Sequence, residues 1–228
     1  MLKVNNKIIK VNNKWLNAEP YPPIVGNTFR IMFSDSSYDP RTDTPDSESF
    51  TATQVSSNPN IWDITQTAQW PTWESVFSSN TYDGYNFNSL NGTFDVIGYG
   101  NELYLGSCYD TFKGSKLRSC CYFPLNTLYD QFFVIGETFE DCIYLTELPD
   151  LNYSEATDAH GHREPLNEYD IDRIYYGCIN VESGILREYN KLSILFPHYS
   201  QPGHPFYNCG SNTTTGAAEL AQIPDNWK

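Results

Sequence analysis

Histidines, cysteines and carboxylates are the residues of this chain with the chemistry for catalysis or metal binding, and their spacing matches no catalytic motif. His160 and His162, with Asp158 and Glu164 nearby, would hold a metal ion only if their loop folded around it. We favour a solvated polar insertion and predict no metal site. The sequence has no P-loop, no H-E-x-x-H and no G-x-S-x-G motif.

The 28 acidic residues place some carboxylates close together by chance alone. A glycosidase pair needs a separation of roughly 5–10 Å in a cleft with sugar-binding aromatics, and a sequence cannot show such a cleft. We therefore predict that the protein is not an enzyme and has no cofactor. A depolymerase of surface polysaccharide is the less favoured alternative.

The six cysteines form no C-x-x-C pair, so the sequence does not support a zinc finger or a thioredoxin-like site. All six lie between residues 108 and 209. Cysteine is among the most frequently buried residue types, and we predict free, buried thiols rather than disulfides.

The net charge of −14 excludes whole classes of partner. Phosphate backbones and anionic membrane surfaces both require a basic face, so we predict no nucleic-acid partner. No segment approaches the roughly 20 apolar residues of a membrane span, and no secretory signal is recognisable. We expect no membrane insertion.

Aromatic residues make up 15% of the chain, and three tryptophans lie close together in sequence. Trp62, Trp70 and Trp73 are candidates for stacking on a sugar, which would make the protein a carbohydrate-binding adhesin module. The alternative, which we favour, is that they form the core of a small β domain.

The first 18 residues repeat the element K-V-N-N-K, at Lys3–Lys7 and at Lys10–Lys14. Asparagine pairs between short apolar segments predict two short strands joined by a turn. Such a basic arm on an acidic protein would act as an anchor by adding strands to a neighbour's sheet. The residues predicted to anchor it are Val4, Ile8, Ile9, Val11 and Trp15.

The sequence divides into three predicted units. Residues 1–25 are the arm and a Pro-rich linker, and residues 26–100 form a small β-rich domain. Strands are predicted at 28–33, 50–55, 61–65 and 94–97 from their alternating apolar residues. Residues 101–228 form the third unit.

An aromatic residue, followed three positions later by serine or cysteine, recurs in the third unit. It occurs at Phe112, Phe139, Tyr175 and Phe206, at intervals of 27, 36 and 31 residues. We predict that these aromatics lie in one interior column of stacked repeats. Helices are predicted at 181–192 and 215–223, with Trp227 folding back to cap the stack.

Segments such as Phe139-Glu-Asp-Cys-Ile-Tyr-Leu-Thr-Glu-Leu-Pro149 and the last 21 residues from Asn208 resemble proteins with BspA-type leucine-rich repeats, and more narrowly a group encoded by phages and prophages of gut bacteria. The resemblance implies an α+β, β-rich fold: an extended arm, a β domain, and a short degenerate leucine-rich-repeat-like solenoid that ends in short helices.

The resemblance also implies a function. It predicts a virion structural or accessory protein, a tail or capsid appendage used for decoration or host attachment. The expected partners are other phage structural proteins, bound through the arm, and a glycan or protein of the host surface. We also expect a homo-oligomer.

Overall fold

The structure is a computed structural model of the 228-residue chain, and it describes residues 9–11, 14–16, 21–26, 28–42, 50–66, 90–100, 111–121, 135–153 and 167–228. Its strands are β1 (Ile9–Val11), β2 (Lys14–Leu16), β3 (Thr28–Phe33), β4 (Phe50–Ser57), β5 (Asn60–Gln66), β6 (Phe94–Tyr99) and β7 (Leu117–Cys120). The helices are α2 (Ile185–Leu195) and α3 (Thr214–Leu220), with 3-10 turns at Pro40–Thr42, Glu168–Ile171 and Asp225–Trp227.

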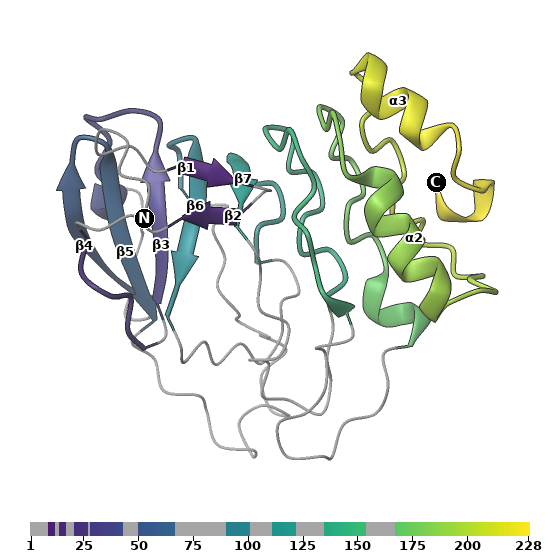
Figure 1. The fold of residues 1–228 in the computed structure, drawn as a ribbon, viewed down its shortest axis with the longest axis horizontal. Helices are drawn as coiled ribbons and strands as arrows, with labels where there is room; N and C mark the ends of the chain where they lie inside the picture. The colour runs from purple at the N-terminus through teal and green to yellow at the C-terminus, as the bar shows by residue number, and fades with distance from the viewer. Residues whose placement is uncertain are drawn as a thin grey trace.

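A five-stranded sheet in the order β4-β5-β3-β6-β7 forms one side of the molecule (Figure 1). The four strands predicted near 28–33, 50–55, 61–65 and 94–97 are all present. They pair antiparallel, whereas β7 pairs parallel with β6. Central strand β3 is buried almost throughout, so its side chains contribute to both faces of the sheet.

Two ion pairs fix the strands to each other. Arg30 in β3 is 1% exposed and donates to both carboxylate oxygens of Asp63 in β5, at 2.6 and 2.7 Å. Asp95 in β6 accepts hydrogen bonds from Arg118 and Ser119 of β7. Buried charges need such partners, because an uncompensated charge in the interior is strongly destabilising.

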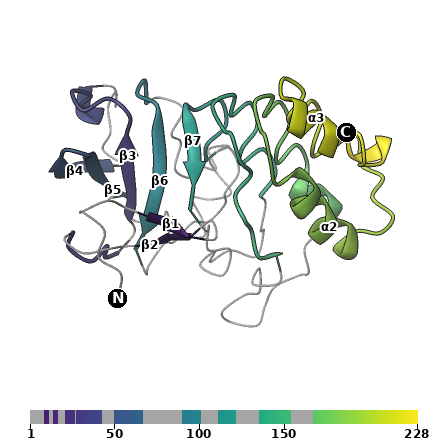
Figure 2. The same cartoon turned by 45° about the horizontal axis from the view of Figure 1, so that its top comes forward.

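Beyond β7 the chain forms a stack of turns that leads to α2 and α3 (Figure 2). Successive turns are joined by backbone hydrogen bonds: Phe112 N–H donates to the Thr138 carbonyl, Phe139 N–H to Ile174, and Tyr175 N–H to Pro205, at 2.9, 3.1 and 2.9 Å. Each turn therefore satisfies the backbone groups of its neighbour.

The leucine-rich-repeat-like solenoid predicted as part of the fold class is wrong. The regular structure of the described residues is mainly β: a single five-stranded mixed sheet, with two short α-helices at the C-terminal end. Among the described residues, the intervals between the predicted repeat anchors contain one strand, β7, and one α-helix, α2, and not a strand and a helix in each. The irregular intervals and the lack of a sustained leucine pattern are the physical reason, because neither suits identical coils.

The turns share a backbone conformation that explains the recurring aromatic. The residue two positions after the aromatic has a positive φ in every described turn: Gly114, Asp141, Gly177 and Asn208, at 65°, 55°, 72° and 57°. The residue two positions before it also has a positive φ where it is described, at Glu137, Arg173 and His204. These paired reversals hold the aromatic inward and prevent helix or strand from continuing.

The C-terminal segment closes the stack. Both predicted helices exist, shifted by a few residues, as α2 and α3. Trp227 is 3% exposed and its ring centroid lies 6.4 Å from that of Phe206. Its carbonyl accepts from Phe206 N–H at 3.0 Å. The prediction that Trp227 folds back to cap the stack is confirmed.

The arm forms the predicted hairpin in the described part of its length. β1 and β2 pair antiparallel, with Val11 opposite Lys14 across Asn12 and Asn13, and they make a separate two-stranded sheet. At residue 100, where a domain boundary was predicted, the structure has paired strands on either side, β6 and β7. One hydrophobic core also extends from the sheet into the turns.

Candidate functional site

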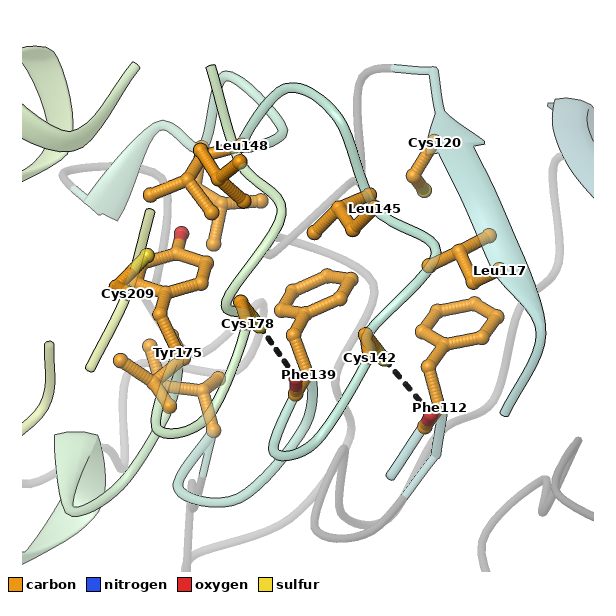
Figure 3. Close-up of a cluster of buried hydrophobic side chains, with 14 of the residues drawn as sticks. Phe112, Leu117, Cys120, Phe139, Cys142, Leu145, Leu148, Tyr175, Cys178 and Cys209 are labelled. Carbon is orange, nitrogen blue, oxygen red and sulfur yellow. Dashed lines mark hydrogen bonds between the residues drawn. The ribbon is translucent and has the colours of Figure 1, made fainter. Parts of the chain in front are cut away.

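Four aromatic rings lie in a column inside the stack of turns. Phe112, Phe139, Tyr175 and Phe206 are all fully buried or nearly so, with consecutive centroids 5.5, 5.7 and 5.5 Å apart and interplanar angles of 14–29°. Figure 3 shows the first three rings one behind another. The predicted interior column is confirmed.

A row of thiols accompanies the rings (Figure 3). Cys142 Sγ donates to the carbonyl oxygen of Phe112, and Cys178 Sγ to that of Phe139, each at 2.9 Å. Burial raises the pKa of the Cys142 thiol to about 12 and that of Cys178 well above its ordinary value. Thiols held protonated in this way are structural and not nucleophilic.

All five cysteines that the structure describes are free and buried, as predicted: Cys120, Cys121, Cys142, Cys178 and Cys209. The sixth, Cys108, lies outside the described residues.

Charged side chains from neighbouring turns form a row of ion pairs, which we call the charged row: Lys113, Glu137, Glu140 and Arg173. Lys113 pairs with Glu137 and lies 3.2 Å from the Glu140 carboxylate, which also pairs with Arg173. Glu140 is only 2% exposed. Burial, reinforced by Glu137 and opposed by Lys113, raises the pKa of Glu140 to about 7.

The row continues as stacked aromatics toward the C-terminus. The Arg173 guanidinium lies 4.6 Å from the Tyr176 ring centroid, and the Tyr176 and Tyr207 rings stack at 4.8 Å. Tyr207 is 41% exposed. Cation–π and stacking contacts of this kind stabilise the outer surface of the stack as the ring column stabilises its interior.

Asp172, Tyr199 and His204 lie near one another at the base of the last two turns. Burial raises the pKa of Asp172, and Arg173 opposes the rise. Burial also raises the pKa of Tyr199, and the nearby Asp172 carboxylate adds to the effect. A Cβ on Gly203 would lie 1.1 Å from Asp172 Oδ1, so only glycine leaves room for this carboxylate.

A second buried polar group lies where α2 packs on the turns. Glu188 is fully buried and accepts from Arg187 at 2.8 Å and from Lys191 at 2.9 Å. The neighbouring hydroxyls of Tyr153 and Tyr175 are 3.1 Å apart. Glu188 also accepts from Leu151 N–H at 3.4 Å, which joins α2 to the segment that carries Tyr153.

The arrangement as a whole resembles a scaffold more than a reaction centre. Glu140 has a pKa suited to proton transfer, but Lys113 and Arg173 already engage its carboxylate. Within the described ranges, no three His, Cys, Asp or Glu side chains gather as a metal site would require. The polar groups of the stack therefore serve chiefly to hold one turn to the next.

Among the described strands, one outer edge of the sheet is not continued by further pairing. β4 is outermost, and among the described strands it pairs only with β5. Thr51, Thr53 and Gln54 are exposed along it. The other outermost strand, β7, is continued by the stack, where Thr146 N–H donates to the Arg118 carbonyl at 3.4 Å.

The predicted site residues have different outcomes. Ile9, Val11 and Trp15 lie in the β1–β2 hairpin, while Val4 and Ile8 lie outside the described residues. Their anchoring role stays a prediction.

Of the three tryptophans, only Trp62 is described. It is 2% exposed, donates to Asn60 at 2.8 Å and has Arg41 5.0 Å from its ring centroid. It therefore belongs to the core and offers no open face to a sugar. Trp70 and Trp73 lie outside the described residues, as do His160 and His162.

The charged row was not predicted from the sequence. Its signal was available: the residues directly after the four recurring aromatics are Lys113, Glu140, Tyr176 and Tyr207, all polar or amphipathic. If each recurring aromatic marks one turn of the stack, the residues directly after the aromatics lie next to one another in successive turns. The partners at the positions before the aromatics, Glu137 and Arg173, follow from the same alignment.

None of the described helices is long and apolar enough to cross a membrane. No family model, no curated protein and no solved structure matches this chain.

Proposed function

We propose that the protein is a non-enzymatic structural or accessory subunit of a bacteriophage virion, a tail or capsid appendage that its N-terminal arm fixes to other structural proteins. Its body of sheet and stacked turns would then serve decoration or host attachment. The phage assignment comes from the sequence resemblance, and the anchoring role from the structure of the arm.

The observation that carries the proposal is the separate β1–β2 sheet. Each strand has only three residues, and the pair is not part of the five-stranded sheet. An isolated two-stranded hairpin is marginally stable in water, so pairing with another chain would stabilise it. Strand addition to a neighbour's sheet supplies such pairing through backbone hydrogen bonds.

The composition of the arm supports the same role. Residues 1–18 contain four lysines and no acidic residue, in a chain whose net charge is −14. A basic arm attached to an acidic body is attracted to acidic partners while the bodies of neighbouring subunits repel each other. The charge therefore favours attachment by the arm and projection of the body.

The test is incorporation into particles. The full chain and a variant lacking residues 1–18 would be expressed in cells that produce the encoding phage, and gradient-purified particles would be probed for each. We expect the full chain to co-sediment with particles and the truncated chain to remain in the soluble fraction. A matched control is Asn17→Ala, outside the strands, which should incorporate normally.

Val11→Pro provides a second variant that keeps the length of the arm. Proline removes a ladder donor and disrupts the hairpin, so incorporation should fall as it does for the truncation. Normal incorporation of the truncated chain, or absence of the full chain from particles, would overturn the proposal. Circular dichroism of the soluble truncated chain would verify that the body is still folded.

A further inference from the structure

Among the described residues, the outer edge of β4 lacks most of the features that normally protect the edge of a sheet. The β4 strand has eight residues with no charge and no proline, and Thr51, Thr53 and Gln54 are exposed. Its first half keeps a regular register with β5, from Phe50 to Gln54, before a bulge interrupts it. Natural edge strands are usually short, charged or covered, because an open edge is a template for pairing.

The segment that precedes β4 in the sequence is complementary in charge to the arm. Residues 35–48, which lead into β4, contain five acidic residues and one arginine, a balance of −4. The arm, residues 1–18, has a balance of +4. Elsewhere two copies of a chain with a charge of −14 repel each other, so an arm-to-edge contact is where they meet most favourably.

The structure also indicates that a single copy does not make this contact with itself. The arm is folded as its own hairpin, and β4 keeps only β5 as its partner among the described strands. The linker's body end is held at β3, two strands from the edge, where the Pro22 carbonyl accepts from Arg30 at 2.8 Å. Among the described residues, the arm and the outer edge of β4 are therefore not paired with each other.

We propose that the outer edge of β4, at Phe50–Gln54, accepts the basic arm of a second copy of this chain as an added strand. The inference rests on the proposed anchoring role of the arm and names its partner. Because the two surfaces differ, the contact is heterologous and joins copies head to tail, in a ring or an open row.

The test is whether the purified full chain associates with itself. Sedimentation would be measured at low ionic strength with protein concentrations up to about 1 mM, which reaches the weak end of specific affinities. We expect the average mass to rise above 26.1 kDa with concentration, and the chain lacking residues 1–18 to stay monomeric.

Charge reversal on both surfaces gives the decisive comparison. Thr51→Lys with Thr53→Lys should weaken association about tenfold, because two new like-charge contacts each change affinity a few-fold. Thr51→Glu with Thr53→Glu, a matched control at the same exposed positions, should leave association equal or tighter. Adding Lys10→Glu and Lys14→Glu to the lysine variant should restore association.

Three results would overturn the inference: a full chain that stays monomeric throughout, association that survives removal of the arm, or lysine and glutamate variants that weaken it equally. The outcome is separable from that of the particle assay. A monomeric chain that still needs its arm for incorporation would leave the proposed function standing with a different partner. A chain that associates with itself but is absent from particles would support the arm-to-edge contact and overturn the proposed function.

Discussion

Replacing Phe139 by alanine should be among the most destabilising single changes in the chain. Its ring is 1% exposed and lies between those of Phe112 and Tyr175, at 5.5 and 5.7 Å. Truncating a buried phenylalanine to alanine costs about 3–5 kcal/mol. Two ring contacts, each worth about 0.5–1.5 kcal/mol beyond burial, place the expected loss in the upper part of that range.

Equilibrium unfolding in urea, followed by circular dichroism, measures this loss. With a slope of roughly 2–3 kcal/mol per molar urea, a loss of about 4 kcal/mol lowers the midpoint by roughly 1.5–2 M at an unchanged slope. The melting temperature should fall by roughly 8–16 °C. Phe139→Leu keeps most of the apolar volume but loses both ring contacts, so a loss of about 1–2 kcal/mol is expected.

Tyr144→Ala serves as the surface control. The tyrosine is 43% exposed and lies five positions after Phe139, outside the column. Its removal should change the free energy of unfolding by less than about 0.5 kcal/mol. If Phe139→Ala were no more harmful than Tyr144→Ala, the ring column would not be what holds the turns together, and the argument from stacking would fail.

Three further predictions concern the same stack. Cys142, whose pKa burial raises to about 12, should resist alkylation at pH 8 in the native protein and react fully in guanidinium, as peptide mass spectrometry would show; rapid native labelling would contradict its burial. The pKa of Glu140 is raised above its unfolded value of 4.5 to about 7. The stability that the protonated Glu140 contributes to the fold is therefore fully present below pH 4.5 and is lost as the pH rises through 7. Relative to wild type, Glu140→Gln should therefore gain on the order of 1 kcal/mol in free energy of unfolding between pH 5 and pH 8, and an equal pH profile in both proteins would refute this. Gly177→Ala should lower the free energy of unfolding in urea by about 2 kcal/mol, and Gly114→Ala by about 1 kcal/mol. Both glycines have a positive φ, but only at Gly177 would an added Cβ meet another residue, Asp141, whose Oδ1 would lie 2.0 Å away. Equal losses would argue against that contact.

Local patterns predicted the elements whose causes are local. Alternating apolar residues located β3, because successive side chains of a strand point to opposite faces of the sheet and this period of two is visible in the sequence. The Asn12-Asn13 pair between apolar segments in the sequence located the hairpin for the same reason. The recurring aromatic located the ring column, since only residues in equivalent surroundings are repeated in this way.

The fold class was mispredicted because one repeated residue does not specify the backbone around it. Leucine-rich repeats and stacked turns both bury an aromatic or aliphatic residue once per layer. The distinguishing signal was the residue two positions after each aromatic, where Gly114, Asp141, Gly177 and Asn208 are types that tolerate a left-handed conformation. The parallel pairing of β6 with β7 had no local signal, because it joins distant segments.

The ring column also limits how copies of this protein can assemble. A stack of turns is open to further layers only where a terminal ring is exposed. At one end Phe112 packs edge-on against Phe29 of the sheet, with centroids 6.2 Å apart, and at the other Phe206 is covered by Trp227. Neither end can accept a layer from another molecule. Association must therefore use surfaces outside the stack, and among the described strands the β4 edge and the β1–β2 hairpin offer such surfaces.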